Sequence, residues 1–298
     1  MTSWHEGDIK VDGLRLHYTR TGGAKPPVVL AHGFSDDGSC WKPVAQILSS
    51  QYDLIMVDAR GHGRSAAPES GYSLMDHARD IAGVINGLGL HRPAVLGHSM
   101  GGATALVLAG AYPLLPSAIL IEDAGAFGMK PSTPTPASQE QGAEEQQEQE
   151  RRQMEEEQAS RERQSGMHAW IRGIQGKTRE ELIAQQRAQT PHWSDDELEP
   201  WADSKLRLSL HVLNRSDAAP VDWPILLRQI TCPALLITGD PSMGAIVTEQ
   251  GATELQTFMP QLRIAHIPNA GHSIRRDQFS AYMDVVRAFL AEWDSLVP

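Results

Sequence analysis

The sequence contains few cysteines and no long apolar stretch. Cys40 and Cys232 are the only cysteines among 298 residues, and their spacing fits neither a redox pair nor a zinc-ligand pair. Without a disulfide framework the chain must fold on its apolar core, for which 41% hydrophobic residues suffice. No apolar run approaches the roughly 20 residues that span a bilayer. We therefore expect reduced thiols, no metal site and no membrane partner.

Positive charge is also scarce. Lys and Arg number 26 against 37 Asp and Glu, a formal net charge of −11, so no nucleic-acid partner is expected, because such a partner requires a basic face. Residues 139–163 hold nine Glu and four Arg, the pattern of a solvated helix face. The first residues lack the basic and apolar regions of a signal peptide. A cytoplasmic location is expected.

Short apolar runs alternate with helical patterns along most of the chain. The runs are continuous, as in strands of a parallel sheet that are buried on both faces. The alternation predicts the α/β class, with a doubly wound, mostly parallel sheet of eight strands that opens with an antiparallel hairpin around Asp12 and Gly13. The predicted strands are 9–11, 14–18, 28–31, 54–57, 94–96, 118–121, 234–238 and 263–267, and the predicted helices are 41–49, 74–88, 100–111, 248–258 and 278–293.

The alternation is interrupted between residues 125 and 224. A Pro/Ser/Thr-rich linker, poorly ordered near 131–136, precedes the charged run, and only helical patterns follow. We predict a helical cap over residues 125–224, inserted into a core domain of residues 1–124 and 225–298. The cap would lie over the carboxyl ends of the strands, where α/β sheets bind ligands.

Ser99 is the candidate nucleophile. It lies in the sequence Gly97-His98-Ser99-Met100-Gly101, between a predicted strand and an Ala/Leu-rich helix. On such a sharp turn, side chains two positions before and after the serine would collide, so both positions favour glycine. The alternative is an ordinary turn serine, and the flanking strand and helix favour the nucleophile.

A serine hydroxyl needs a base and, for acyl transfer, donors that stabilise the oxyanion. His272 follows the last predicted strand, at the same edge of the sheet as Ser99. The backbone amides of Phe34 and Met100 are the candidate oxyanion donors. We expect His32 to hold the Phe34 loop by hydrogen bonds and not to act as a second base.

Four residues are candidate substrate contacts. Gly33 lies in the expected oxyanion loop, and Trp41 either touches substrate or, as we favour, packs beneath the site. Trp193 and Trp223 belong to the predicted cap. They indicate either an apolar or aromatic substrate or simple packing of the cap on the body, and both interpretations stay open.

Together these motifs resemble the α/β-hydrolase superfamily. The serine elbow, the later histidine, the loop of residues 32–34 and the segment DARGHGRS at 58–65 carry the resemblance, which covers the chain except the helical insert. It implies the α/β-hydrolase fold and hydrolysis by a Ser-His-Asp triad, without cofactor. The segment GHGRSA mimics a dinucleotide fingerprint, but Pro68 follows where a helix should begin, so no dinucleotide is expected.

The acid of the triad is ambiguous. The family usually places it after the strand 234–238 as G-x-x-D, where this chain has Ser242 instead. Asp240 lies two residues early and is followed by Pro241, which restricts the loop. Some family members carry the acid one strand earlier, where this chain has Asp123. We predict Asp123, with Asp240 as the alternative.

The expected activity is hydrolysis of a carboxylic ester or lactone of an apolar or aromatic small molecule. The resemblance also allows cleavage of C–C or amide bonds, cofactor-free perhydrolysis and, less favoured, ligand binding without turnover. A serine at position 99 excludes dehalogenase and epoxide hydrolase chemistry, which use aspartate there. A homodimer is one of the assemblies left open.

Overall fold

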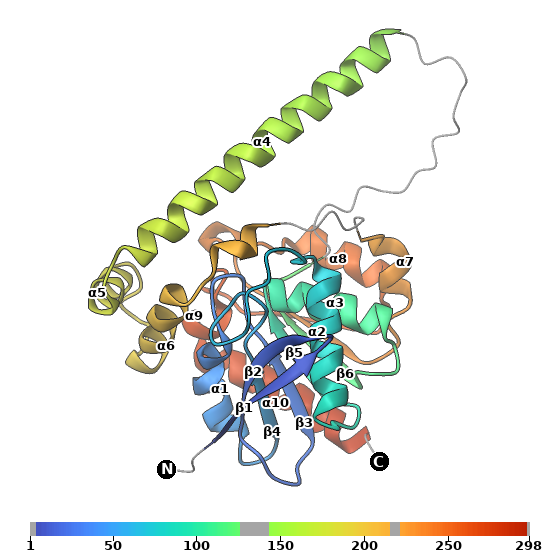
Figure 1. Cartoon of the computed structure of the whole chain (residues 1–298). Coiled ribbons are helices and arrows are strands. Elements are labelled where there is room, and N and C mark those ends of the chain that lie inside the picture. The colour runs from blue at the N-terminus through green and yellow to red at the C-terminus, as the bar shows by residue number, and fades with distance from the viewer. Residues whose placement is uncertain (1–3, 126–142, 215–220, 297–298) are drawn as a thin grey trace.

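A mostly parallel sheet forms the centre of the molecule. The computed structural model describes residues 4–125, 143–214 and 221–296 (Figure 1). Within these residues eight strands pair in the order β1-β2-β4-β3-β5-β6-β7-β8. The strands are β1 His5–Val11, β2 Leu14–Arg20, β3 Pro27–Ala31, β4 Asp53–Val57, β5 Ala94–His98, β6 Ala118–Glu122, β7 Ala234–Thr238 and β8 Leu262–His266.

The sheet register confirms the predicted fold class. β1 and β2 form the expected antiparallel hairpin, and β2 also pairs antiparallel with β4. All the remaining pairs are parallel. Every residue of β4, β5, β6 and β7 is buried, which explains why their sequences are continuous apolar runs.

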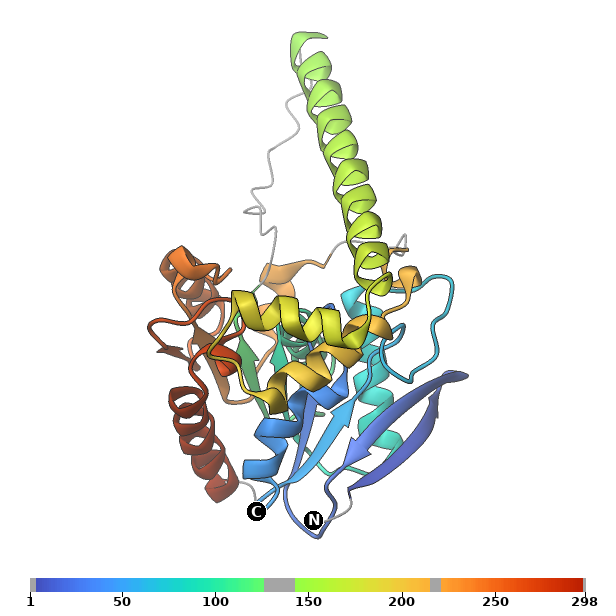
Figure 2. The same ribbon diagram turned by 90° about the vertical axis from the view of Figure 1, so that its left-hand side faces the viewer.

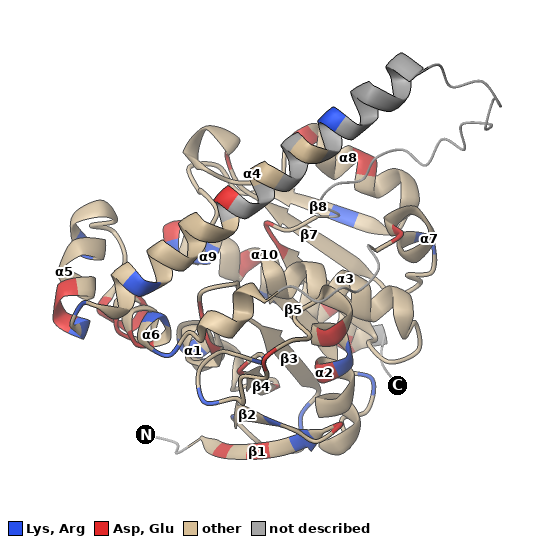
Figure 3. Ribbon diagram, turned by 45° about the horizontal axis from the view of Figure 1, so that its top comes forward, with Lys and Arg blue, Asp and Glu red and all other residues tan. Residues whose placement is uncertain are grey.

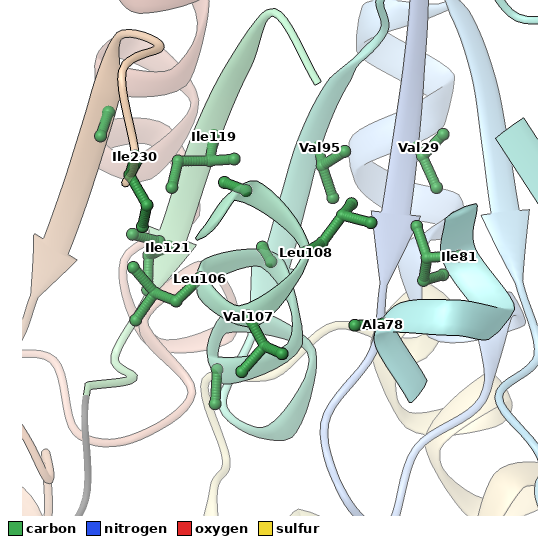
Figure 4. Packing of buried hydrophobic residues seen from close by; sticks show 14 of the residues in the cluster. Val29, Ala78, Ile81, Val95, Leu106, Val107, Leu108, Ile119, Ile121 and Ile230 are labelled. Carbon is green, nitrogen blue, oxygen red and sulfur yellow. The ribbon is translucent and has the colours of Figure 1, made fainter. Parts of the chain in front are cut away.

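Helices cover both faces of the sheet. The described α-helices are α1 Lys42–Leu48, α2 Leu74–Gly87, α3 Met100–Ala111, α4 Ala143–Gln175, α5 Arg179–Gln189, α6 Asp195–Leu206, α7 Trp223–Arg228, α8 Glu249–Phe258, α9 Ile274–Asp277 and α10 Phe279–Leu296. On one face α2 and α3 pack on the strands, where Leu106 and Leu108 lie near Val95 and Ile121 (Figure 4). On the other face α1 and α10 bury a second apolar cluster around Trp41.

The segment between β6 and β7 contains only helical elements among its described residues. α4 projects away from the body, whereas α6 lies against the body beside α1 and α5 packs on α6 (Figures 1 and 2). Acidic and basic residues are interspersed along α5, α6 and the coloured part of α4 (Figure 3). The linker at 131–136, for which we expect poor order, lies outside the described residues. The exact boundaries of the cap stay a prediction.

Candidate active site

Ser99 occupies a strained turn between β5 and α3. Its backbone has φ +52° and ψ −114°, a conformation that residues other than glycine seldom adopt. A Cβ at Gly97 would lie 2.2 Å from the carbonyl oxygen of Gly101, and one at Gly101 would lie 2.1 Å from that of Ala31. Both positions therefore require glycine. The turn leaves Ser99 partly exposed at the end of the strand.

His272 contacts Asp123, which directly follows β6. The His272 Nδ1–H donates to Asp123 Oδ2 at 2.7 Å, so the Nε2 atom carries the lone pair that a general base needs. Asp123 has no exposed surface, whereas 37% of the His272 side chain is exposed. The backbone amides of Ile246 and Val247 donate to the two oxygens of Asp123 at 2.9 and 3.0 Å. The carboxylate is thereby fixed in one orientation.

Asp240 lies beside a different histidine. Its Oδ1 is 3.0 Å from His266 Nε2, and its Oδ2 accepts the Asn269 amide at 2.7 Å. Among the described residues, no hydrogen bond joins Asp240 to His272. Of the two aspartates that the sequence offered as the acid, the structure brings Asp123 to His272.

The loop that follows β3 lies beside Ser99. A Cβ at Gly33 would be 3.5 Å from the Cβ of Ser99, which places the backbone that leads to Phe34 next to the serine. Met100 is the first residue of α3, so its N–H has no acceptor within the helix. These two amides are the donors that the sequence proposed for the oxyanion.

His32 holds this loop in place. Its Nδ1–H donates to the Gly33 oxygen at 2.8 Å, and its Nε2 accepts the Ala59 amide at 3.0 Å. Burial lowers the pKa of His32 to about 4, so the ring stays neutral and has no free nitrogen. It therefore supports the loop and cannot serve as a second base.

The three tryptophans proposed as substrate contacts are buried. Trp41 has no exposed surface, and the guanidinium of Arg275 lies 4.4 Å from its ring centre. Trp193 donates from Nε1 to Asp277 at 3.0 Å, and Trp223 is part of the core on the α3 side of the sheet. The burial of all three rings favours packing over substrate contact, which for Trp41 is the interpretation that the sequence favoured.

A buried network of six charges lies behind the site, and the sequence did not predict it. Asp36 accepts from Lys205 at 2.9 Å and from both Arg275 and Arg276 at 3.1 Å. Burial would raise the pKa of Asp36, but the three cations hold it well below its usual range. Glu122 and Glu197 pair with the two arginines. The network joins the Phe34 loop, the end of β6, α6 and α9, the helix that follows His272.

The sequence shows the residue types of this network but not their pairing. Two acidic residues follow the expected oxyanion loop and two arginines follow His272, in segments that the topology brings to one edge of the sheet. Consecutive like charges in loops are usually solvated, however, and no local pattern distinguishes a buried pair. Only the tertiary structure shows which charges meet.

A small apolar cluster borders the Phe34 loop. It is formed by Ile171 of α4 and by the segment around Leu208 and Val212, and Phe34 and Tyr72 pack against it. Neither a cluster of three metal-ligating side chains nor a helix long and apolar enough to cross a membrane occurs in the described ranges. The loop that carries Phe34 thus has an apolar cluster on one side.

Comparison with known proteins defines the class. The family model of the alpha/beta hydrolase fold matches residues 26–275, so the chain belongs to this family and is a hydrolase.

Particular relatives narrow the comparison. The chain is similar to the 2-(acetamidomethylene)succinate hydrolase of Mesorhizobium japonicum, with 27% identity over 86% of this chain and 84% of that protein. It is also similar to the N-formylmaleamate deformylase of Pseudomonas putida, with 25% identity over 95% and 96% of the two chains. Among solved structures, the enol-lactonase of Burkholderia xenovorans LB400 has a TM-score of 0.70 and 24% identity over 96% of this chain and all of that one.

Proposed function

We propose that the protein hydrolyses a carboxylic ester or lactone of a small apolar molecule, with Ser99 as nucleophile, His272 as base and Asp123 as the orienting acid. The observation that carries this proposal is the 2.7 Å contact between His272 and an Asp123 whose two oxygens are each held by a backbone amide. Ser99 directly follows His98, and the ring of His98 lies 4.8 Å from the ring of His272.

The proposed reaction has two steps. His272 Nε2 takes the Ser99 proton while the Ser99 oxygen attacks the substrate carbonyl carbon, and the amides of Phe34 and Met100 stabilise the oxyanion. The C–O bond to the leaving group breaks, and the leaving alkoxide receives the proton from His272. Water, deprotonated by the same Nε2, then attacks the acyl carbon. The bond from this carbon to the Ser99 oxygen breaks, His272 returns the proton to Ser99, and the carboxylic acid is released. Asp123 stabilises the imidazolium that forms in each step.

The border of the site supports an apolar acyl group. Phe34 of the oxyanion loop packs with Tyr72, Met167 and Leu210 around a buried apolar cluster. An uncharged alkyl or aryl chain would gain about 25 cal/mol for each Å² of apolar surface it buried there.

Amide hydrolysis is the second candidate. The names of the two relatives above denote N-acyl substrates, and the same triad chemistry cleaves amides when His272 protonates the leaving nitrogen. Esters remain our first choice because the alkoxide is the better leaving group and the bordering side chains are apolar.

The test is a substrate panel with the purified protein and its Ser99→Ala variant. The panel contains p-nitrophenyl esters of increasing acyl length, γ- and δ-lactones and the matching p-nitroanilides. We expect ester or lactone turnover that is lost in the variant, and covalent labelling of Ser99 by a fluorophosphonate. Turnover of anilides alone would favour the amidase, and an unlabelled Ser99 with no turnover would favour ligand binding without catalysis.

A further inference from the structure

His98 is a buried histidine that the proposed reaction does not use. It is the last residue of β5, it immediately precedes Ser99, and it is only 4% exposed. Its Nε2 lies 2.9 Å from the backbone oxygen of His272, which is 174 residues later in the chain. The two rings are 4.8 Å apart at an interplanar angle of 43°. The side chain thus connects the serine turn with the loop that carries the base.

The hydrogen bond fixes the tautomer of His98. Burial lowers the pKa of His98 well below 6.5, and Arg275 and His272 also oppose its positive charge. A neutral imidazole carries one proton, and because a carbonyl oxygen can only accept, this proton is on Nε2. Nδ1 is buried and has no hydrogen-bond partner among the described residues. The ring therefore makes a single directed hydrogen bond.

The surroundings leave His98 little freedom to move. A Cβ at Gly33 would lie 2.7 Å from Nδ1 of His98, so the oxyanion loop approaches the ring closely on that side. The His272 loop lies against the ring and accepts its hydrogen bond. The ring is enclosed between the oxyanion loop and the His272 loop, and the proposed reaction requires both loops at fixed positions relative to Ser99.

We propose that His98 is a positioning residue that holds the backbone of His272 at the correct distance from Ser99. The proposal rests on the proposed roles of Ser99 and His272. Asp123 orients the imidazole through Nδ1, and His98 holds the same residue at its carbonyl group, so His272 is anchored at two points. Because His98 and Ser99 are adjacent, the hydrogen bond from His98 fixes the backbone of His272 relative to the nucleophile.

The expected effect is on the rate of chemistry rather than on substrate binding. A displacement of about 1 Å between reacting groups costs about a hundredfold in rate. Loss of the His98 hydrogen bond would allow a displacement of this kind without removing any group that touches substrate. We therefore expect kcat to fall and KM to change little.

The main test compares His98→Leu with His98→Gln. Leucine fills a similar volume but cannot donate, whereas the glutamine amide nitrogen can reach the position of Nε2. We expect kcat of the leucine variant to fall about 10- to 100-fold with KM within about twofold, and the glutamine variant to recover most of the loss. The rate of fluorophosphonate labelling at Ser99 should fall in parallel with kcat. His91→Leu, which removes an exposed imidazole, is the matched control and should leave all these values unchanged.

A second measurement uses the unmodified protein, so that a misfolded variant does not decide the outcome. Nitrogen-15 NMR of histidine-labelled protein should show His98 as the neutral Nε2–H tautomer at pH 6. A charged ring or an Nδ1–H tautomer would overturn the proposal, as would a folded His98→Leu variant with unchanged kcat, or a His98→Gln variant impaired as much as His98→Leu. If the wild type turns over no substrate and is not labelled, the proposed function fails, and the tautomer still tests the His98 hydrogen bond.

Discussion

Two loops at the carboxyl edge of the sheet each place an aspartate against a histidine. After β6, Asp123 lies 2.7 Å from His272 and has no exposed surface. After β7, Asp240 lies 3.0 Å from His266. The Asp240 side chain is 29% exposed and the His266 side chain 50%. The pairs have similar contact distances but very different surroundings.

The surroundings decide what each carboxylate can do. Asp123 receives two backbone amides and no solvent, so its orientation is fixed and its interaction with an imidazolium is strong. Asp240 pairs with a histidine that borders a surface cavity of about 630 Å³, where water screens the charges. The second nitrogen of His266 also lies 3.2 Å from Thr238 Oγ1. A histidine and an aspartate in contact therefore do not by themselves define a catalytic pair.

The different roles of Asp123 and Asp240 are tested by replacing each carboxylate in turn with an amide. We expect Asp123→Asn to lower kcat/KM about 10³- to 10⁴-fold, because the amide favours the wrong His272 tautomer. Asp240→Asn should leave kcat/KM within about twofold. Steady-state kinetics on the best ester of the panel measures both. A large loss in Asp240→Asn beside a nearly normal Asp123→Asn would reverse the assignment.

The same contrast between buried and exposed charge applies to stability. Asp36→Ala leaves three buried cations without their shared anion, which we expect to cost about 3–5 kcal/mol of unfolding free energy. Asp240→Ala removes a partly exposed carboxylate and should cost less than about 1 kcal/mol. Urea unfolding at pH 7 measures both free energies. Equal losses would show that burial does not set the strength of these pairs.

Acid should destabilise the fold through His32. Its pKa is about 4 in the folded protein against an ordinary value of 6.5, so between these values the unfolded chain binds a proton that the folded protein does not. The contribution of His32 to the free energy of unfolding is therefore fully present above pH 6.5 and is lost as the pH falls toward 4. At pH 5 this loss is about 2 kcal/mol.

The matched variant for this measurement is His32→Gln, which does not titrate and can still accept the Ala59 amide. Burial raises the pKa of Asp58 to about 6, which gives an opposite slope, but this group is present in both proteins. The free energy of unfolding should fall more between pH 7 and pH 5 in the wild type than in the variant. Parallel pH dependence would show that His32 does not titrate as described.

The smallest expected effect is that of His266→Gln. It removes an exposed imidazole from the second pair, so activity should be unchanged and stability should change by less than about 1 kcal/mol. Substrate turnover and urea unfolding check both. Loss of activity here would mean that the loop after β7 contributes to catalysis.

The sequence predicted the sheet well because its signals are local. Continuous apolar runs specify strands buried on both faces, and the glycines at 97 and 101 specify the turn at Ser99. The choice between Asp123 and Asp240 was harder, because it depends on which loop approaches His272. The amides of Ile246 and Val247 that hold Asp123 come from more than 120 residues away.

The sequence could not predict contacts that depend on tertiary packing. The network around Asp36 joins segments that no periodicity relates. Trp193 is buried where it donates to Asp277 and contacts Arg276. The hydrogen bond from His98 to His272 likewise joins two distant loops. In each case the residue type is visible in the sequence, but the partner is not.

The roles of Ser99 and Asp123 are tested most directly by the site and rate of fluorophosphonate labelling, with the adduct located by peptide mass spectrometry in the wild type and in Asp123→Asn. We expect a single adduct on Ser99 that forms rapidly in the wild type and far more slowly in the variant. An adduct on another residue, or equal labelling rates in the two proteins, would contradict these roles.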